Sequence, residues 1–118
     1  MIAPTARGLG VRVPEDIKPD ADGVVAPNMG GMSVSPDSLW NLPAHRRPRT
    51  LGRGSTGHAN DAVYESTPQT LTPYDLSVRA DPSAPTTHAF VEPATRCLLV
   101  DYQQNISSSK PSWRRIQP

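Results

Sequence analysis

Two serines that follow a pair of glycines are well placed for chemistry in this chain. Met32–Ser35 alternates apolar and polar residues, which predicts a strand with Ser33 and Ser35 on the same face. Gly30 and Gly31 let the backbone bend or approach another group closely. Two hydroxyls on such a face would suit a polar ligand lying on the strand. The alternative is a polar, solvent-facing strand edge preceded by a glycine turn.

A second chemical cluster lies in the strand predicted over Thr86–Val91, which Pro93 ends. Alternation there places His88, Phe90 and Glu92 on one face. Each polar residue also has an ordinary explanation. A histidine in a strand often serves as a structural hydrogen-bonding group, and a glutamate at a strand end is usually exposed to solvent.

The densest basic patch is His45–Arg49 together with Arg53. It could contact nucleic-acid phosphates, or grip the pyrophosphate of a dinucleotide through forked guanidinium contacts. It could equally be a solvated loop. Gly52–His58 is too rich in glycine for regular structure and is expected to be a flexible loop. Its Gly-x-Gly pattern lacks the strand-to-helix context of a dinucleotide fingerprint.

Composition limits the classes of protein that this chain can represent. With 118 residues it forms one small domain, 1–118, and its eight glycines and fourteen prolines predict long loops. A net charge of +1 argues against a general polyanion binder. The only cysteine, Cys97, excludes an internal disulfide and is expected to be buried or half-buried on a helix, and inert.

Targeting and metal-binding signals are not found in the sequence. It has no apolar run long enough to cross a membrane and no signal peptide at its start, so we expect export only by a dedicated system. Its three histidines are too scattered to predict zinc, and no metal is expected.

The predicted elements are short and mixed. A first strand is expected at Arg7–Val13, and Ser35 is expected to cap a short helix that begins at Pro36. Later elements are a strand at Asp61–Glu65, a helix at Thr95–Ser107 and a final packing strand around Trp113 and Ile116.

Four blocks of the sequence resemble a known family. Asp22–Val34 reads Asp-Gly-x-x-Ala-Pro-x-x-Gly-Gly-x-Ser-Val, and Thr87–Ala94 reads Thr-His-x-x-apolar-x-Pro-Ala. Arg7–Leu9 and Asn41–Arg49 are weaker matches. Taken in their order along the chain, the blocks resemble the Tse-two toxin family of type VI secretion effectors. The resemblance implies an ADP-ribosyltransferase-like fold, a small α/β (α+β) domain with two short, mainly antiparallel sheets, few helices and many loops.

The resemblance also implies a reaction and its residues. An enzyme of this kind is a toxin that cleaves the nicotinamide–ribose bond of NAD and transfers ADP-ribose to an acceptor, here an unknown macromolecule. By similarity, Arg7 would contact the phosphate side, Ser33 would brace the nicotinamide ribose, and Glu92 would bind the ribose 2′-hydroxyl and orient the nucleophile. The expected NAD-binding residues are Arg7, Ser33, Ser35, His45, Arg46, Arg47 and His88.

The same resemblance implies partners and a place of action. An immunity protein would protect a bacterial producer, and the toxin would act in the cytoplasm of a producing or target cell. Two alternatives remain. One is a non-catalytic binding module of the same fold that blocks a partner protein. The other is an arginine-patch nucleic-acid binder, which predicts strong salt dependence. Sparse aromatic residues weigh against base stacking, so nucleic acid is not the expected partner.

Overall fold

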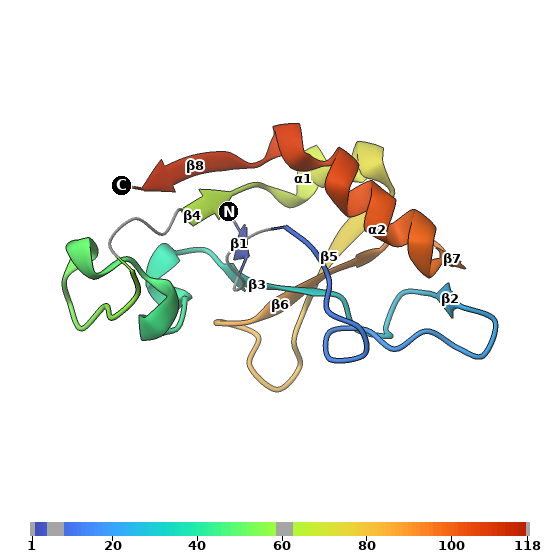
Figure 1. Cartoon of the computed structure of the whole chain (residues 1–118), viewed down its shortest axis with the longest axis horizontal. Coiled ribbons are helices and arrows are strands. Elements are labelled where there is room, and N and C mark those ends of the chain that lie inside the picture. Colours follow the sequence, from blue (N-terminus) through green and yellow to red (C-terminus); the bar gives the residue numbers. More distant parts are fainter. Residues whose placement is uncertain (1, 5–8, 59–62, 118) are drawn as a thin grey trace.

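A four-stranded antiparallel sheet forms the centre of the molecule (Figure 1). The computed structural model describes residues 2–4, 9–58 and 63–117. In the order β1-β3-β6-β5, the strands of this main sheet are β1 (Ile2–Pro4), β3 (Met32–Pro36), β6 (Ala89–Pro93) and β5 (Leu76–Ala80). β3 and β6 therefore occupy the two internal positions.

Two short strand pairs flank the main sheet. β2 (Val24–Val25) pairs with β7 (Cys97–Leu98), and β4 (Val63–Glu65) pairs with β8 (Arg114–Gln117). Ile2 joins the main sheet to the second pair, because its amide and carbonyl both bond to Ser66 next to β4. The predicted strand at Asp61–Glu65 is thus present over its described part, and the predicted final strand is also present.

The helices are few and short. α1 (Pro68–Leu71) begins at a capping box formed by Thr67 and Thr70, and α2 (Leu99–Ser108) is the one helix of ten residues. Single 3₁₀ turns occupy η1 (Leu39–Asn41), η2 (Ala44–Arg46), η3 (Arg49–Leu51), η4 (Thr72–Tyr74) and η5 (Lys110–Ser112). The expectation of a small, loop-rich α+β fold with short antiparallel sheets is confirmed.

The main core lies between the sheet and α2. Met32 and Val91 are directly opposite each other on β3 and β6 and are buried against Tyr102 and Ile106 of α2. A smaller cluster of Ala3, Leu42 and Val63 lies near β1. In Figure 1, α2 and β8 run along the upper side of the view, while the loop between β5 and β6 extends below. No helix within the described ranges has the length and apolar character needed to cross a membrane.

The first predicted strand is wrong over its described part. Residues 9–13 form a bend and a turn, and the strand lies at Ile2–Pro4 instead. Arg7 falls outside the described residues. Leu9 and Val11 still pack against the main core, so their apolar spacing reflects burial without a strand partner.

Two helix predictions also need correction. Pro36 is the last residue of β3, and the short helix begins only at Leu39, where the hydroxyl of Ser38, not Ser35, accepts from the amide of Trp40. The helix predicted from Thr95 begins at Leu99, because Cys97–Leu98 is extended and pairs with β2. Cys97 therefore lies in a strand, half-buried, and burial raises the pKa of its thiol.

Candidate functional site

One face of the two internal strands is polar, as the alternation in both sequences predicts. Ser33 of β3 is directly opposite Phe90 of β6, and Phe90 is directly opposite Arg79 of β5. Residues that oppose each other in an antiparallel pair point to the same side. Glu92 is two residues beyond Phe90 and shares that side. The row Ser33–Phe90–Arg79 and the carboxylate of Glu92 thus form one surface, called here the polar sheet face.

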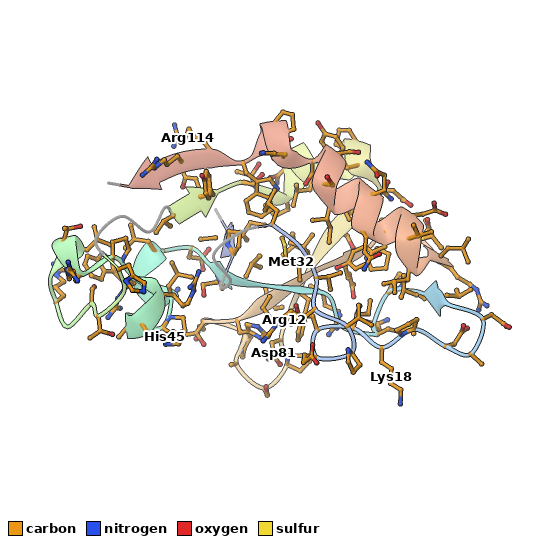
Figure 2. The ribbon with its side chains drawn as sticks, viewed as in Figure 1. Arg12, Lys18, Met32, His45, Asp81 and Arg114 are labelled. Atoms are coloured by element: carbon orange, nitrogen blue, oxygen red, sulfur yellow. The ribbon has the colours of Figure 1, made fainter. Side chains whose placement is uncertain are left out.

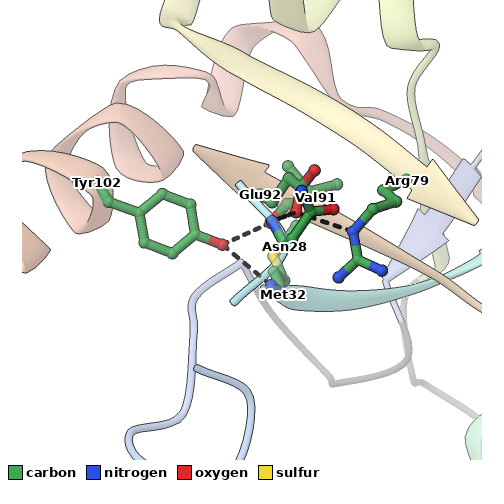
Figure 3. Close-up of polar contacts among 6 residues, drawn as sticks. All are labelled: Asn28, Met32, Arg79, Val91, Glu92 and Tyr102. Carbon is green, nitrogen blue, oxygen red and sulfur yellow. Dashed lines mark hydrogen bonds and ion pairs between the residues drawn. The ribbon is translucent and has the colours of Figure 1, made fainter. Parts of the chain in front are cut away.

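Glu92 is buried and held by two donors on this face. Its side chain is 6% exposed, and its Oε2 accepts from the backbone N–H of Asn28 at 2.9 Å and from Nε of Arg79 at 3.1 Å (Figure 3). The Arg79 guanidinium carbon also lies 4.9 Å from the centroid of the Phe90 ring. The explanation of Glu92 as an exposed strand-end charge is therefore wrong. The carboxylate has a fixed orientation and a counter-charge.

The paired glycines bring Asn28 to this carboxylate. A Cβ at Gly31 would lie 2.4 Å from the carbonyl oxygen of Val91, and one at Gly30, where φ is +105°, would lie 2.2 Å from that of Asp16. Only glycine permits backbone segments to pass so closely. The close approach predicted from the sequence is present, and the approaching groups are carbonyls of the chain itself.

A tyrosine from α2 fixes the opposite side of the same strands. The hydroxyl of Tyr102 accepts from the amide of Met32 at 3.0 Å and donates to the carbonyl of Val91 (Figure 3). Burial raises the pKa of the Tyr102 phenol, so it remains a donor at any ordinary pH. Because Val91 precedes Glu92 directly, this contact also holds the strand segment that carries the carboxylate.

His88 directly precedes β6, on the same side of the strand as Phe90, and its side chain has a partner of its own. Its Nδ1 is 2.8 Å from Oδ2 of Asp81, and its ring meets Phe90 edge-on at 4.8 Å between centroids. Asp81 also accepts hydrogen bonds from the amide and the hydroxyl of Ser83. The bond to His88 lowers the pKa of Asp81 most, and together with the two Ser83 bonds it brings this pKa to about 2. Residues 81–88 are a hydrogen-bonded turn, which is why β6 begins at Ala89 and not at Thr86.

The structure brings together only part of the predicted site. Ser33, His88 and Glu92 share the polar sheet face, and Ser33 has interactions with neighbouring groups. Ser35 is on the same side but is buried, and its hydroxyl donates to the carbonyl of Asn41 in η1 at 3.4 Å. The alternative of a solvent-facing edge strand is wrong, since β3 is internal. Arg7, the third predicted catalytic residue, lies outside the described residues.

The predicted phosphate-binding residues lie elsewhere. His45, Arg46 and Arg47 belong to residues 38–58, called here the arginine lobe, a series of 3₁₀ turns that follows the Pro36 end of β3. Figure 2 shows His45 in this lobe at one end of the molecule. Nε of Arg47 donates to the hydroxyl of Ser55 and its Nη1 to the carbonyl of Trp40, both within the lobe.

Sequence reasoning missed three residues that hold Glu92 or the strand that carries it. Arg79, Asn28 and Tyr102 contact Glu92 or its strand, yet they come from different parts of the chain. The register between β5 and β6, which places Ser77 opposite Glu92 and Arg79 opposite Phe90, would have indicated Arg79. The turn residues at 81–88 were the signal that the two flanking segments pair as a hairpin, and this pairing would have placed Arg79 beside Phe90.

A cavity of about 510 Å³ lies away from this face, on the side of the sheet that carries α2. The residues that line this cavity include Tyr64, Ile106, Trp113 and Lys110. None of the predicted site residues that the structure describes lines this cavity.

Comparisons with known proteins returned no match to a family model, to a curated protein or to a solved structure. The resemblance to the Tse-two toxin family therefore stays a prediction from the motifs.

Proposed function

We propose that this protein is an NAD-dependent ADP-ribosyltransferase whose reacting groups lie on the polar sheet face. One observation carries the proposal. A hydroxyl and a buried, oriented carboxylate, Ser33 and Glu92, share one face of two adjacent internal strands. The motif resemblance predicts the same two residues.

The chemistry needs a fixed negative charge beside a developing positive one. When the bond between ribose C1′ and the nicotinamide nitrogen breaks, nicotinamide leaves as a neutral molecule and C1′ becomes electron-poor. A carboxylate next to the ribose stabilises that charge and binds the 2′-hydroxyl. The acceptor nucleophile then forms its bond to C1′ and releases its proton. Glu92 fills the carboxylate role, and Ser33 braces the ribose.

Arg79 is a positioning residue in this proposal. Its bond to Oε2 fixes the direction of the carboxylate before substrate binds. The backbone amide of Asn28 holds the same oxygen, and the Glu92 residue as a whole is 4% exposed. The proposal therefore requires the Asn28 segment to move aside when NAD binds.

The test is release of nicotinamide and transfer of labelled ADP-ribose from NAD in the presence of a cell lysate. Glu92→Gln keeps the size of the side chain and removes its charge, so we expect a loss of at least about 100-fold in rate. Glu65→Gln is the matched control, because Glu65 on β4 pairs with Arg114 away from the polar sheet face. Its rate should remain within about twofold of the unmodified protein.

Ser33→Ala and Arg7→Gln complete the set, and each should lower the rate. Circular dichroism and thermal unfolding establish that every variant is folded. A folded Glu92→Gln variant with full activity would remove the carboxylate from the mechanism. A protein that neither turns over NAD nor binds it in calorimetry would support the binding module of the same fold instead.

A further inference from the structure

The charges of this chain are unevenly distributed. The arginine lobe holds four of the twelve Lys and Arg residues and none of the eleven Asp and Glu residues. The rest of the chain therefore carries a net charge of −3, although the whole chain carries +1. The near-neutral net charge of the whole chain therefore includes one strongly basic segment, the arginine lobe. Figure 1 shows this segment extending beyond β3.

Four of the described arginines outside the lobe, Arg12, Arg79, Arg96 and Arg114, pair with carboxylates. Arg12 lies 3.1 Å from Asp16, Arg96 lies 3.8 Å from Asp20, and Arg79 pairs with Glu92 as described. Within the part of the chain that the structure describes, no ion pair forms at Arg47, Arg49 or Arg53. Among the residues that the structure describes, the charges of Arg47, Arg49 and Arg53 are thus not paired with a carboxylate.

Two of these guanidiniums, those of Arg47 and Arg53, contact the same Trp40 ring. The guanidinium carbons of Arg47 and Arg53 lie 5.2 and 4.8 Å from the centroid of the Trp40 ring. Arg47 is fixed further by its bonds to Ser55 and to the Trp40 carbonyl. The indole attracts each cation, yet the two like charges repel each other. A bound anion would remove that repulsion.

We propose that the arginine lobe binds the phosphate backbone of a nucleic acid without reading its bases. Planar guanidiniums match phosphate oxygens in pairs of hydrogen bonds. Trp40, the one Phe, Tyr or Trp residue of the lobe, is already in contact with two guanidiniums, so its ring is not free to stack on a base. Binding therefore depends on phosphates alone, and the scarcity of aromatic residues does not oppose it.

A protein partner fits this surface less well. Protein interfaces have an apolar centre around large anchor side chains. The large hydrophobic residues that the structure shows exposed are Val13, Leu98 and Val100, all outside the lobe. This inference concerns a different surface from the proposed NAD reaction and does not depend on it.

The experiment is fluorescence anisotropy with a labelled single-stranded RNA of about 20 nucleotides over a series of NaCl concentrations. Three phosphate contacts predict a slope of about −2 in a plot of log K against log salt. Arg49→Gln with Arg53→Gln should weaken binding at least about tenfold at low salt and make the slope shallower than about −1. Arg12→Gln with Arg96→Gln is the matched control, and it removes the same charge from exposed sites outside the lobe.

Each outcome decides the proposal. An equal loss in the control pair, or binding with no salt dependence, overturns it. Poly-glutamate that competes as well as RNA would make the surface a general carboxylate binder and would also overturn it. Inorganic pyrophosphate as effective as RNA at equal phosphate concentration would identify a small phosphate ligand, not a nucleic-acid backbone. Folded Glu92→Gln should bind RNA normally, which separates this test from the test of NAD turnover.

Discussion

In the described part of the chain, arginine meets an aromatic ring at two places, and the two differ in one respect. On the polar sheet face, Arg79 lies over Phe90 and also bonds to the buried carboxylate of Glu92. In the arginine lobe, Arg47 and Arg53 lie over Trp40, and no carboxylate of residues 38–58 is available to either. The ring contacts are similar, with guanidinium carbons 4.8 to 5.2 Å from the centroids.

The difference shows what each arrangement is able to do. A guanidinium that already holds a carboxylate orients that carboxylate and has little charge left for an external anion. Guanidiniums held only by an aromatic ring and neutral oxygens keep their charge for a ligand. The first region is therefore organised for positioning a reactive group, and the second for attracting a partner.

The largest effect should come from breaking the pair on the sheet. Arg79→Met would leave the Asn28 amide as the one described donor to the buried Glu92, at a cost of about 3 kcal/mol in the free energy of unfolding. The partial exposure of Arg79, 27% of its side chain, keeps the cost at the lower end for a buried pair. Urea unfolding measures it. The double variant Arg79→Met, Glu92→Gln should regain part of the loss, and no recovery would contradict the importance of the pair.

A smaller loss is expected from Gly31→Ala. The new methyl group would meet the Val91 carbonyl at 2.4 Å, so the strand or the Asn28 segment must shift, at a cost of about 2 kcal/mol. The same shift should weaken the Asn28 contact to Glu92 and alter NAD turnover, if the proposed reaction is correct. Thermal unfolding measures the first effect. Unchanged stability would show that the backbone contact is looser than described.

Replacing an arginine of the lobe should cost less. Arg47→Met removes two hydrogen bonds and one ring contact from a partly exposed site, for a loss of about 1 kcal/mol. Urea unfolding followed by Trp fluorescence measures the change. A loss as large as that for Arg79→Met would remove the distinction drawn between the two regions.

The smallest expected effect is a loss of folding stability at low pH that comes from Asp81, at the end of the main sheet, and not from the arginine lobe. The folded pKa of Asp81, about 2, is below its ordinary value, so its bonds stabilise the protein above about pH 4. That contribution is lost as the pH falls through the folded pKa. Thermal unfolding between pH 5 and 2 should therefore fall less steeply for Asp81→Asn. An identical pH profile would show that the bonds to His88 and Ser83 add nothing.

Local alternation was enough to predict part of the polar sheet face. It placed Ser33 and Ser35 on one side of a strand, and Phe90 and Glu92 on one side of another, and both assignments are confirmed. Alternation did not predict that Glu92 is buried. That Glu92 is enclosed depends on Arg79 and on the Asn28 segment, which only the tertiary structure brings to it.

Errors in the predicted elements have similar causes. Leu9 and Val11 alternate as strand residues do, yet they bury their side chains against the core without strand pairing. Cys97 and Leu98 lie inside the helix predicted over Thr95–Ser107, yet they pair with β2 as a strand. In each case a distant partner decided the local conformation, and a single sequence does not reveal that partner.

The phenol of Tyr102 has a consequence for how the molecule opens. Since one hydroxyl bonds to both internal strands, detaching α2 leaves a donor on β3 and an acceptor on β6 without partners. The helix and this end of the sheet should then unfold as one cooperative unit. Amide hydrogen exchange at Met32 should accordingly proceed at the same rate as exchange in the middle of α2.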